Sequence, residues 1–273
     1  MILFGDTRFG AIETALERVE HTLTRLWLSE LSFVAKDQLE VAMQNGHAVT
    51  KYDLRVRDVF IRELAPCCSD TLVFEEDIRP GDAGNASSLC LVDPIDATHN
   101  LTNGYPSIAA SAAFIEDGQI VFSWVMDIAR QSAYVALRGG GAFKKTSLAW
   151  RRTEASRCRT LGSSWCSVMA GARLGGSRPS KIRSQSCLAL DACLIASGQL
   201  DGFVDLIDGA RHKVCDVAAA ALVVRESGGF VFDRAEQALL TDEDLTSDLD
   251  RRYNVAVAAT KELGEQLCQI QMS

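Results

Sequence analysis

The spacing of the hydrophobic residues changes from a helical to a strand-like period near residue 70. Residues 11–31 are apolar at every third or fourth position, which predicts an amphipathic helix. Residues 51–64 repeat this spacing after a glycine-containing loop at 43–50, and they predict a second helix with Asp53 at its N-terminal cap. The first part of the chain therefore groups two helices before any strand.

From residue 71 onward, short strand-like runs replace the helical spacing. Residues 71–77 and 88–93 each end in acidic residues. Residues 107–143 alternate like successive antiparallel strands, with Asp117-Gly118 as a hairpin turn. The remaining predicted elements are helices at 187–198 and 216–229 that stop at glycine, strands at 229–233 and 253–260, and a helix after Lys261. This order predicts an α+β or layered α/β fold.

Composition narrows the possible partners and location. The chain has 273 residues, 47% of them hydrophobic, and a formal charge of -8. That charge gives no basic surface for nucleic acid or an anionic membrane, so we expect neither as a partner. No run approaches the roughly 18 apolar residues of a membrane span, and the N-terminus lacks the features of a signal peptide. We expect a cytoplasmic protein.

The nine cysteines form no C-x-x-C pair. An odd count without metal-ligand spacing argues against a disulfide framework and structural zinc. Reduced thiols in the core are the favoured interpretation, and a catalytic cysteine is the alternative.

The segment VDPIDATHN holds the densest candidate chemistry. Asp93 and Asp96 lie three residues apart, and like charges so close raise each other's pKa. Mg²⁺ relieves this repulsion, because it prefers oxygen ligands at about 2.0–2.1 Å. Pro94 restricts the backbone between them, so the Ile95 carbonyl can face the same space. A simple Asp-Pro turn is the alternative reading of the tetrapeptide.

A helix that begins near Ala97-Thr98 would place free backbone N–H groups beside these carboxylates. Such a helix start is a site for anions, so a cation and a phosphate would share one corner. Thr98 is either an ordinary N-cap or a hydroxyl that orients an attacking water.

At this point the chain resembles a known family. VDPIDATHNLTNG is similar to the D-P-(I/L)-D-G-T-x-N signature of the inositol monophosphatase superfamily, and CDVAAAALVVRESGG is similar to its second signature. These proteins are Mg²⁺-dependent, lithium-sensitive phosphomonoesterases. The resemblance covers about residues 10–265. It implies one domain over residues 1–273, with halves 1–150 and 151–273, folded as a layered α-β-α-β-α sandwich and commonly a homodimer.

The resemblance also implies roles for individual residues. Glu75, Asp93 and the Ile95 carbonyl match the first metal site, while Asp93, Asp96 and Asp216 match the second. Two Mg²⁺ ions, or three with a loosely held one near Glu75, would act on the substrate. Asp53, Glu75 and Thr98 match the group that orients or deprotonates the water. Asp53 and Asp216 also suit helix caps, and Glu76 and Asp77 are expected to be solvated.

Substrate contacts are the least specific part of the resemblance. Its substrate-binding positions fall on Asp96, Ala97, Thr98, Ser186, Asp208 and Arg211. Arg211 and Lys213 would suit a second phosphate, as in the archaeal-type enzymes for inositol phosphate and fructose bisphosphate, or form a solvated basic loop. Two rivals remain: a 3′-phosphoadenosine 5′-phosphate nucleotidase, and a weakly catalytic protein that acts as a regulatory partner.

Two departures concern the motifs themselves. Ala97 replaces the glycine of the first signature, and Cys215 replaces the tryptophan of the second. A left-handed backbone at Ala97 would cost about 1 kcal/mol or more, whereas a negative φ would cost nothing. No metal-ligand position is lost.

Overall fold

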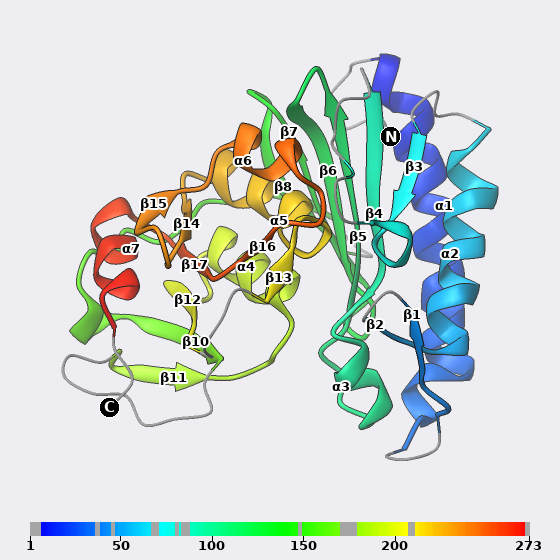
Figure 1. Cartoon of the computed structure of the whole chain (residues 1–273), viewed down its shortest axis with the longest axis horizontal. Coiled ribbons are helices and arrows are strands. Elements are labelled where there is room, and N and C mark those ends of the chain that lie inside the picture. The colour runs from blue at the N-terminus through cyan, green and yellow to red at the C-terminus, as the bar shows by residue number, and fades with distance from the viewer. Residues whose placement is uncertain are drawn as a thin grey trace.

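Five alternating layers of helices and sheets make up the chain in a computed structural model (Figure 1). The structure describes residues 7–35, 39–44, 47–66, 71–79, 82, 88–146, 149–169, 179–206 and 211–270. From right to left in Figure 1 the layers are a helix pair, a large sheet, a second helix pair, a smaller sheet and a last helix. The expected α-β-α-β-α sandwich is confirmed.

The outer helix pair consists of α1 (Thr7–Ser29) and α2 (Lys51–Leu64). Both bury the apolar stripe predicted from their spacing against one face of the large sheet. The cap prediction was wrong by three residues. Thr50 is the N-cap of α2, and Asp53 is the third helical residue, whose Oδ2 accepts from the Thr50 backbone N–H at 2.7 Å.

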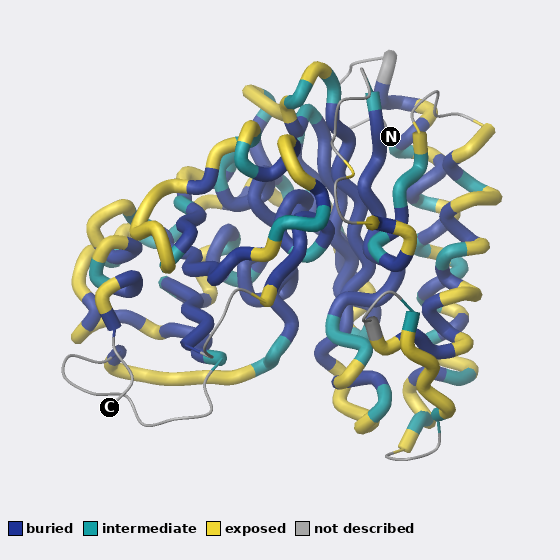
Figure 2. The backbone as a smooth tube through the Cα atoms, in the orientation of Figure 1, coloured by how far each residue is buried: buried dark blue, intermediate teal, exposed yellow. Residues whose placement is uncertain are grey.

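The large sheet has seven strands in the order β3-β4-β5-β6-β7-β8-β9. Only β3 and β4 run parallel; the other neighbours are antiparallel, and the Asp117-Gly118 turn joins β5 to β6 as predicted. Strands β4 and β5 are buried almost throughout because helices cover both faces of the sheet (Figure 2). The strands are β3 (Thr71–Phe74), β4 (Ser88–Asp96), β5 (Ala109–Glu116), β6 (Gln119–Asp127), β7 (Ser132–Leu137), β8 (Gly141–Lys145) and β9 (Trp150–Arg152).

The central layer is formed by α4 (Leu188–Ala196) and α5 (Val214–Glu226). Nearly every residue of α5 is buried, because sheets lie on both sides of it. Its run of alanines keeps the helix narrow enough for both sheets to approach. Both helices end before a left-handed glycine, Gly198 and Gly228, as their sequences predicted.

The smaller sheet has six strands in the order β11-β10-β12-β17-β14-β15, and α7 (Lys261–Cys268) covers its outer face. Beside it, β13 (His212–Lys213) pairs with β16 (Arg252–Tyr253). The six strands are β10 (Trp165–Met169), β11 (Lys181–Arg183), β12 (Gly202–Asp205), β14 (Phe230–Asp233), β15 (Ala238–Leu239) and β17 (Val255–Ala258).

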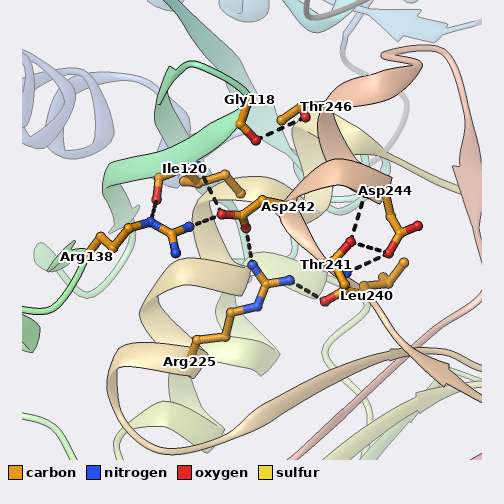
Figure 3. Close-up of polar contacts among 9 residues, drawn as sticks. All are labelled: Gly118, Ile120, Arg138, Arg225, Leu240, Thr241, Asp242, Asp244 and Thr246. Carbon is orange, nitrogen blue, oxygen red and sulfur yellow. Dashed lines mark hydrogen bonds and ion pairs between the residues drawn. The ribbon is translucent and has the colours of Figure 1, made fainter.

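A partly exposed ion-pair network ties α6 (Asp242–Ser247) to the large sheet and the central layer (Figure 3). Asp242 accepts from both Arg138, beyond β7, and Arg225 of α5. Burial, with the nearby charge of Arg138, lowers the pKa of Arg225 to about 10. One helical turn later, the Thr246 hydroxyl donates to the Gly118 carbonyl at 3.2 Å. This network fixes α6 against the β5–β6 turn.

The structure also tests the predictions for the 43–50 loop, the cysteines and membrane spans. The loop expected at 43–50 contains a short hairpin, β1 (Ala42–Gln44) with β2 (His47–Val49), so a plain loop was wrong there. Six of the cysteines are free and buried, Cys158 is free and half-buried, and Cys67 and Cys68 lie outside the described residues. No helix among the described residues is long and apolar enough to span a membrane.

The contact between α7 and the smaller sheet predicts a steep cost for Gly264→Ala. A Cβ at Gly264 would lie 2.0 Å from Cε2 of Phe232 on β14, and the ring is buried. We expect the variant to lose about 2 kcal/mol of unfolding free energy and about 4 °C in Tm. Gly162→Ala is the control, because a Cβ there meets no atom within 4 Å. Equal melting temperatures for the two variants would contradict this packing.

Candidate metal and phosphate site

Three carboxylates from three elements converge at one end of the large sheet. Glu75 begins the short helix η2 (Glu75–Asp77) directly after β3, Asp93 lies on β4, and Asp216 lies in the first turn of α5. Strands β3 and β4 are parallel, and Phe74 pairs with Val92. Glu75 and Asp93, the next residue of each strand path, therefore lie beside one another. Ligand oxygens of the three residues lie within 4.8 Å of one another.

The cluster is electrostatically costly without a cation. Burial raises the pKa of Asp93 well above its ordinary range, and the charges of Glu75, Asp96 and Asp216 raise it further. Burial and the charge of Glu75 likewise raise the pKa of Asp216, although the Lys213 N–H donates to its Oδ2 at 2.8 Å. Among the described residues, the buried Oδ2 of Asp93 has no hydrogen-bond partner. An unpartnered buried carboxylate oxygen inside an acidic cluster fits a cation.

Asp96 is held apart from this trio. Its Oδ2 accepts from the Cys187 thiol at 3.1 Å and from the Ala189 N–H, in the first turn of α4, at 2.9 Å. Burial raises the pKa of Asp96, and these two hydrogen bonds oppose the shift. One carboxylate oxygen is therefore committed to α4, and Oδ1 is the oxygen left for an ion or a substrate.

The predicted water-orienting residues lie together. The Thr98 hydroxyl, at the start of α3 (Thr98–Thr102), lies 3.0 Å from both Asp53 Oδ1 and the Ile95 carbonyl oxygen. Burial raises the pKa of Asp53, and hydrogen bonds from Thr50 and Thr98 oppose this. The structure thus joins α2 to the start of α3 across 45 residues of sequence.

A pocket of about 250 Å³ connects these groups, and both acidic and basic side chains line it. His212 lies within it, between Asp205 (Nε2 to Oδ2, 3.0 Å) and Asp216 (Nδ1 to Oδ2, 4.0 Å). No Phe, Tyr or Trp is among the described residues that line the pocket. Its acidic lining consists of Asp53, Glu75, Glu76, Asp93, Asp96 and Asp216, and its basic lining of His99, Arg211, His212, Lys213 and Arg252.

Comparison with known proteins assigns the chain to a family. The model of the "Inositol monophosphatase family" matches residues 10–273. The chain belongs to the inositol monophosphatase family. An inositol-1-monophosphatase of Mesorhizobium japonicum is 28% identical over 208 residues, 71% of this chain and 76% of that protein. A Nus factor SuhB of Xylella fastidiosa is 29% identical over 215 residues, which are 76% of this chain and 74% of that protein.

Two further matches come from Thermotoga maritima. A fructose-1,6-bisphosphatase/inositol-1-monophosphatase is 28% identical over 188 residues, 68% of this chain and 71% of that protein. The solved structure of an IMPase superposes with a TM-score of 0.74 at 23% identity and covers 97% of this chain and 96% of that one. That structural likeness supports the shared fold.

The family is metal-dependent, and this chain's donors fit a hard cation. Glu75, Asp93 and Asp216 offer only oxygen ligands, the set that Mg²⁺ prefers. Asp96 and the Ile95 carbonyl line the same pocket and stay predicted as further ligands.

Two expectations about neighbouring residues need correction. Glu76 is buried rather than solvated, and burial with the charges of Glu75 and Asp53 raises its pKa to about 7. Asp77 is exposed as expected, but it pairs with Arg57 at 2.5 Å. Asp208 lies outside the described residues, whereas Ser186 and Arg211 line the pocket.

The sequence reasoning missed several groups at the pocket. It gave His99 and His212 no role, although both line the pocket. It also gave no hint of Cys187 or Arg252. His212 had a usable signal, because it lies four residues before Asp216 at the entry to α5; Arg252 had none, because only the pairing of β13 with β16 brings it there.

Ala97, which replaces the glycine of the family signature, has a left-handed backbone conformation, and this conformation is strained for alanine. Its φ and ψ are 68° and 48°, directly before the first helical residue of α3. We expect Ala97→Gly to raise the unfolding free energy by up to about 1 kcal/mol, which is about 2 °C in Tm. The comparison is thermal unfolding of both proteins without added Mg²⁺. A lower Tm for the glycine variant would show that packing of the methyl group outweighs the strain.

Metal binding predicts a pH-dependent stabilisation. A carboxylate whose folded pKa is raised stabilises the fold at low pH and loses that contribution as pH rises through the folded pKa. Mg²⁺ binds the deprotonated form, so it should restore stability at pH 7.5 and act little at pH 5. For a millimolar site, 10 mM Mg²⁺ adds about 1.4 kcal/mol, or about 3 °C in Tm.

Asp93→Asn is the matched variant for this measurement. It removes one charge from the cluster, so its metal-free Tm at pH 7.5 should exceed that of the wild type, while its response to Mg²⁺ should be lost. A wild-type Tm that ignores Mg²⁺ at both pH values would contradict a preformed site.

Proposed function

We propose that the chain is a Mg²⁺-dependent phosphomonoesterase that hydrolyses small sugar or polyol phosphates. The observation that carries the proposal is the cluster of Glu75, Asp93 and Asp216 beside the Thr98–Asp53 pair, in a pocket of a chain of this family. We further propose a cytoplasmic homodimer with two or three Mg²⁺ ions. Nucleic acid and membranes are not among the proposed partners.

The residues of the pocket would divide the work of hydrolysis. Glu75, Asp93, Asp96, Asp216 and the Ile95 carbonyl would hold the ions. Bound Mg²⁺ supplies charge neutralisation of the phosphate and the leaving oxygen and acidifies water. When the Thr98 hydroxyl donates to Asp53, its oxygen lone pairs are free to accept from a water in the pocket and aim it at phosphorus.

The reaction needs no covalent enzyme intermediate. The oxygen of water bonds to phosphorus as the ester P–O bond breaks, the departing alkoxide takes up a proton, and Asp53 or Glu75 receives the proton released by the water. Burial raises the pKa of Asp53, which suits a proton acceptor. Asp96, Ala97, Thr98, Ser186, Asp208 and Arg211 are the proposed substrate contacts.

Pocket size and lining favour a sugar or polyol over a nucleotide. A volume of about 250 Å³ suits a small metabolite, and no described aromatic residue offers a face for adenine. The two lead substrates are myo-inositol-1-phosphate and fructose-1,6-bisphosphate, consistent with the names of the Mesorhizobium and Thermotoga relatives. The 3′-phosphoadenosine 5′-phosphate nucleotidase activity is thereby disfavoured.

A regulatory role is the second candidate function. Its support is the similarity to a protein named Nus factor SuhB, together with the strained Ala97 in the first motif. The retained carboxylates favour catalysis instead.

Phosphate release decides between these functions. The wild type is assayed with myo-inositol-1-phosphate, fructose-1,6-bisphosphate and 3′-phosphoadenosine 5′-phosphate, each with and without Mg²⁺. We expect Mg²⁺-dependent turnover of at least one of the first two, and a loss of about 100-fold or more in kcat for Asp93→Asn. Exclusive turnover of the nucleotide would overturn the substrate class.

Arg251→Gln is the control, because Arg251 pairs with Glu236 rather than lining the pocket. It should retain full activity. Equally slow release by wild type and Asp93→Asn would favour the regulatory candidate.

A further inference from the structure

Two residues that line the pocket adopt a backbone conformation that favours glycine. Of the described residues, five that are not glycine have positive φ. Asp117, Gln131 and Gln237 lie in tight turns between strands, where this conformation is common. Ala97 (φ 68°) and Ser186 (φ 53°) instead lie in the pocket wall. Strain at a binding site, rather than in a hairpin, points to a role for the side chains.

The surrounding structure holds both residues in place through bonds between their two segments. Asn100, buried in α3, donates its side-chain amide to the Gln185 carbonyl at 2.8 Å and to the Ser107 carbonyl at 2.7 Å. In the opposite direction, the Cys187 thiol and the Ala189 N–H donate to Asp96. Residues 96–100 and 185–189 are therefore fixed against each other on both sides of the strained positions.

Glycine would remove the strain at either position but would also remove a side chain from the pocket wall. The side chains are a methyl group at Ala97 and a hydroxymethyl group at Ser186, in a pocket of only about 250 Å³. Ala97 lies between Asp96 and Thr98, where we place the reacting phosphate. Added atoms there limit the width available to the carbon that carries the ester oxygen.

We propose that Ala97 and Ser186 are specificity-determining residues that narrow the pocket, so that primary phosphate esters are hydrolysed in preference to secondary ones. A primary ester carbon bears one carbon substituent, whereas a secondary one bears two and needs a wider pocket. The inference rests on the proposed phosphatase function. Of the two lead substrates it favours fructose-1,6-bisphosphate, in which both phosphates are primary esters, over myo-inositol-1-phosphate, which is a secondary ester.

Two isomers that differ only in this property provide the test. Glycerol-1-phosphate is a primary ester and glycerol-2-phosphate a secondary one. The ratio of their kcat/KM values is measured with Mg²⁺ for wild type, Ala97→Gly, Ser186→Gly and Gln237→Gly. Gln237 is the matched control, because it has the same strain (φ 51°) in the exposed β14–β15 turn.

We expect the wild type to prefer the primary ester, and each of the two pocket variants to reduce that preference about tenfold, the usual effect of one carbon in a pocket. Gln237→Gly should raise Tm without changing the ratio. An unchanged ratio in both pocket variants, or an equal change in Gln237→Gly, would overturn the inference while leaving the phosphatase function intact. No release from either isomer by a wild type that hydrolyses fructose-1,6-bisphosphate or myo-inositol-1-phosphate would overturn the inference alone. No Mg²⁺-dependent release from any of these four esters would overturn both.

Discussion

Repulsion among three clustered carboxylates, one buried and two partly buried, is the constraint around which this end of the molecule is organised. Glu75, Asp93 and Asp216 belong to elements far apart in sequence, so the cluster exists only when the large sheet and the central helices have packed. The free energy for that assembly comes from the apolar core of β4, β5 and α5, which is almost wholly buried. A folded protein can therefore hold a site that opposes its own stability until a cation enters it.

The sequence predicted those elements whose own residues decide their structure. The helical spacing in residues 11–31 specified α1, and the alanine-rich run ending at Gly228 specified α5, because burial on one face or on all faces leaves a readable pattern. The hairpin β1–β2 and the pair β13–β16 were not predicted, since strands of two or three residues depend on a partner that local spacing does not reveal. The prediction that Asp216 lies near Asp93 came from the motif resemblance and not from the hydrophobic periodicity.

At the pocket, the unpredicted features are all products of tertiary contact. Cys187 reads as one more core thiol in the sequence, yet it donates to Asp96 and so decides which carboxylate oxygen remains available. Glu76 follows Glu75 in an acidic run that looks solvated, yet η2 turns it inward. The sequence left the sign of φ at Ala97 undecided. The path of the chain from β4 into α3 requires the left-handed conformation there.

The charge distribution explains how an acidic protein can attract an anion. The chain carries a formal charge of -8, which at long range repels a phosphate ester. Salt, however, screens charges that are more than about 10 Å away, so close to the pocket the charges that line it dominate. Arg211 and Arg252 lie exposed in the pocket wall. The Arg252 guanidinium donates to the Arg211 carbonyl at 3.3 Å, which keeps the two residues side by side. The carboxylates would contribute attraction only through bound cations, so the same pocket would repel phosphate when metal-free and bind it when loaded.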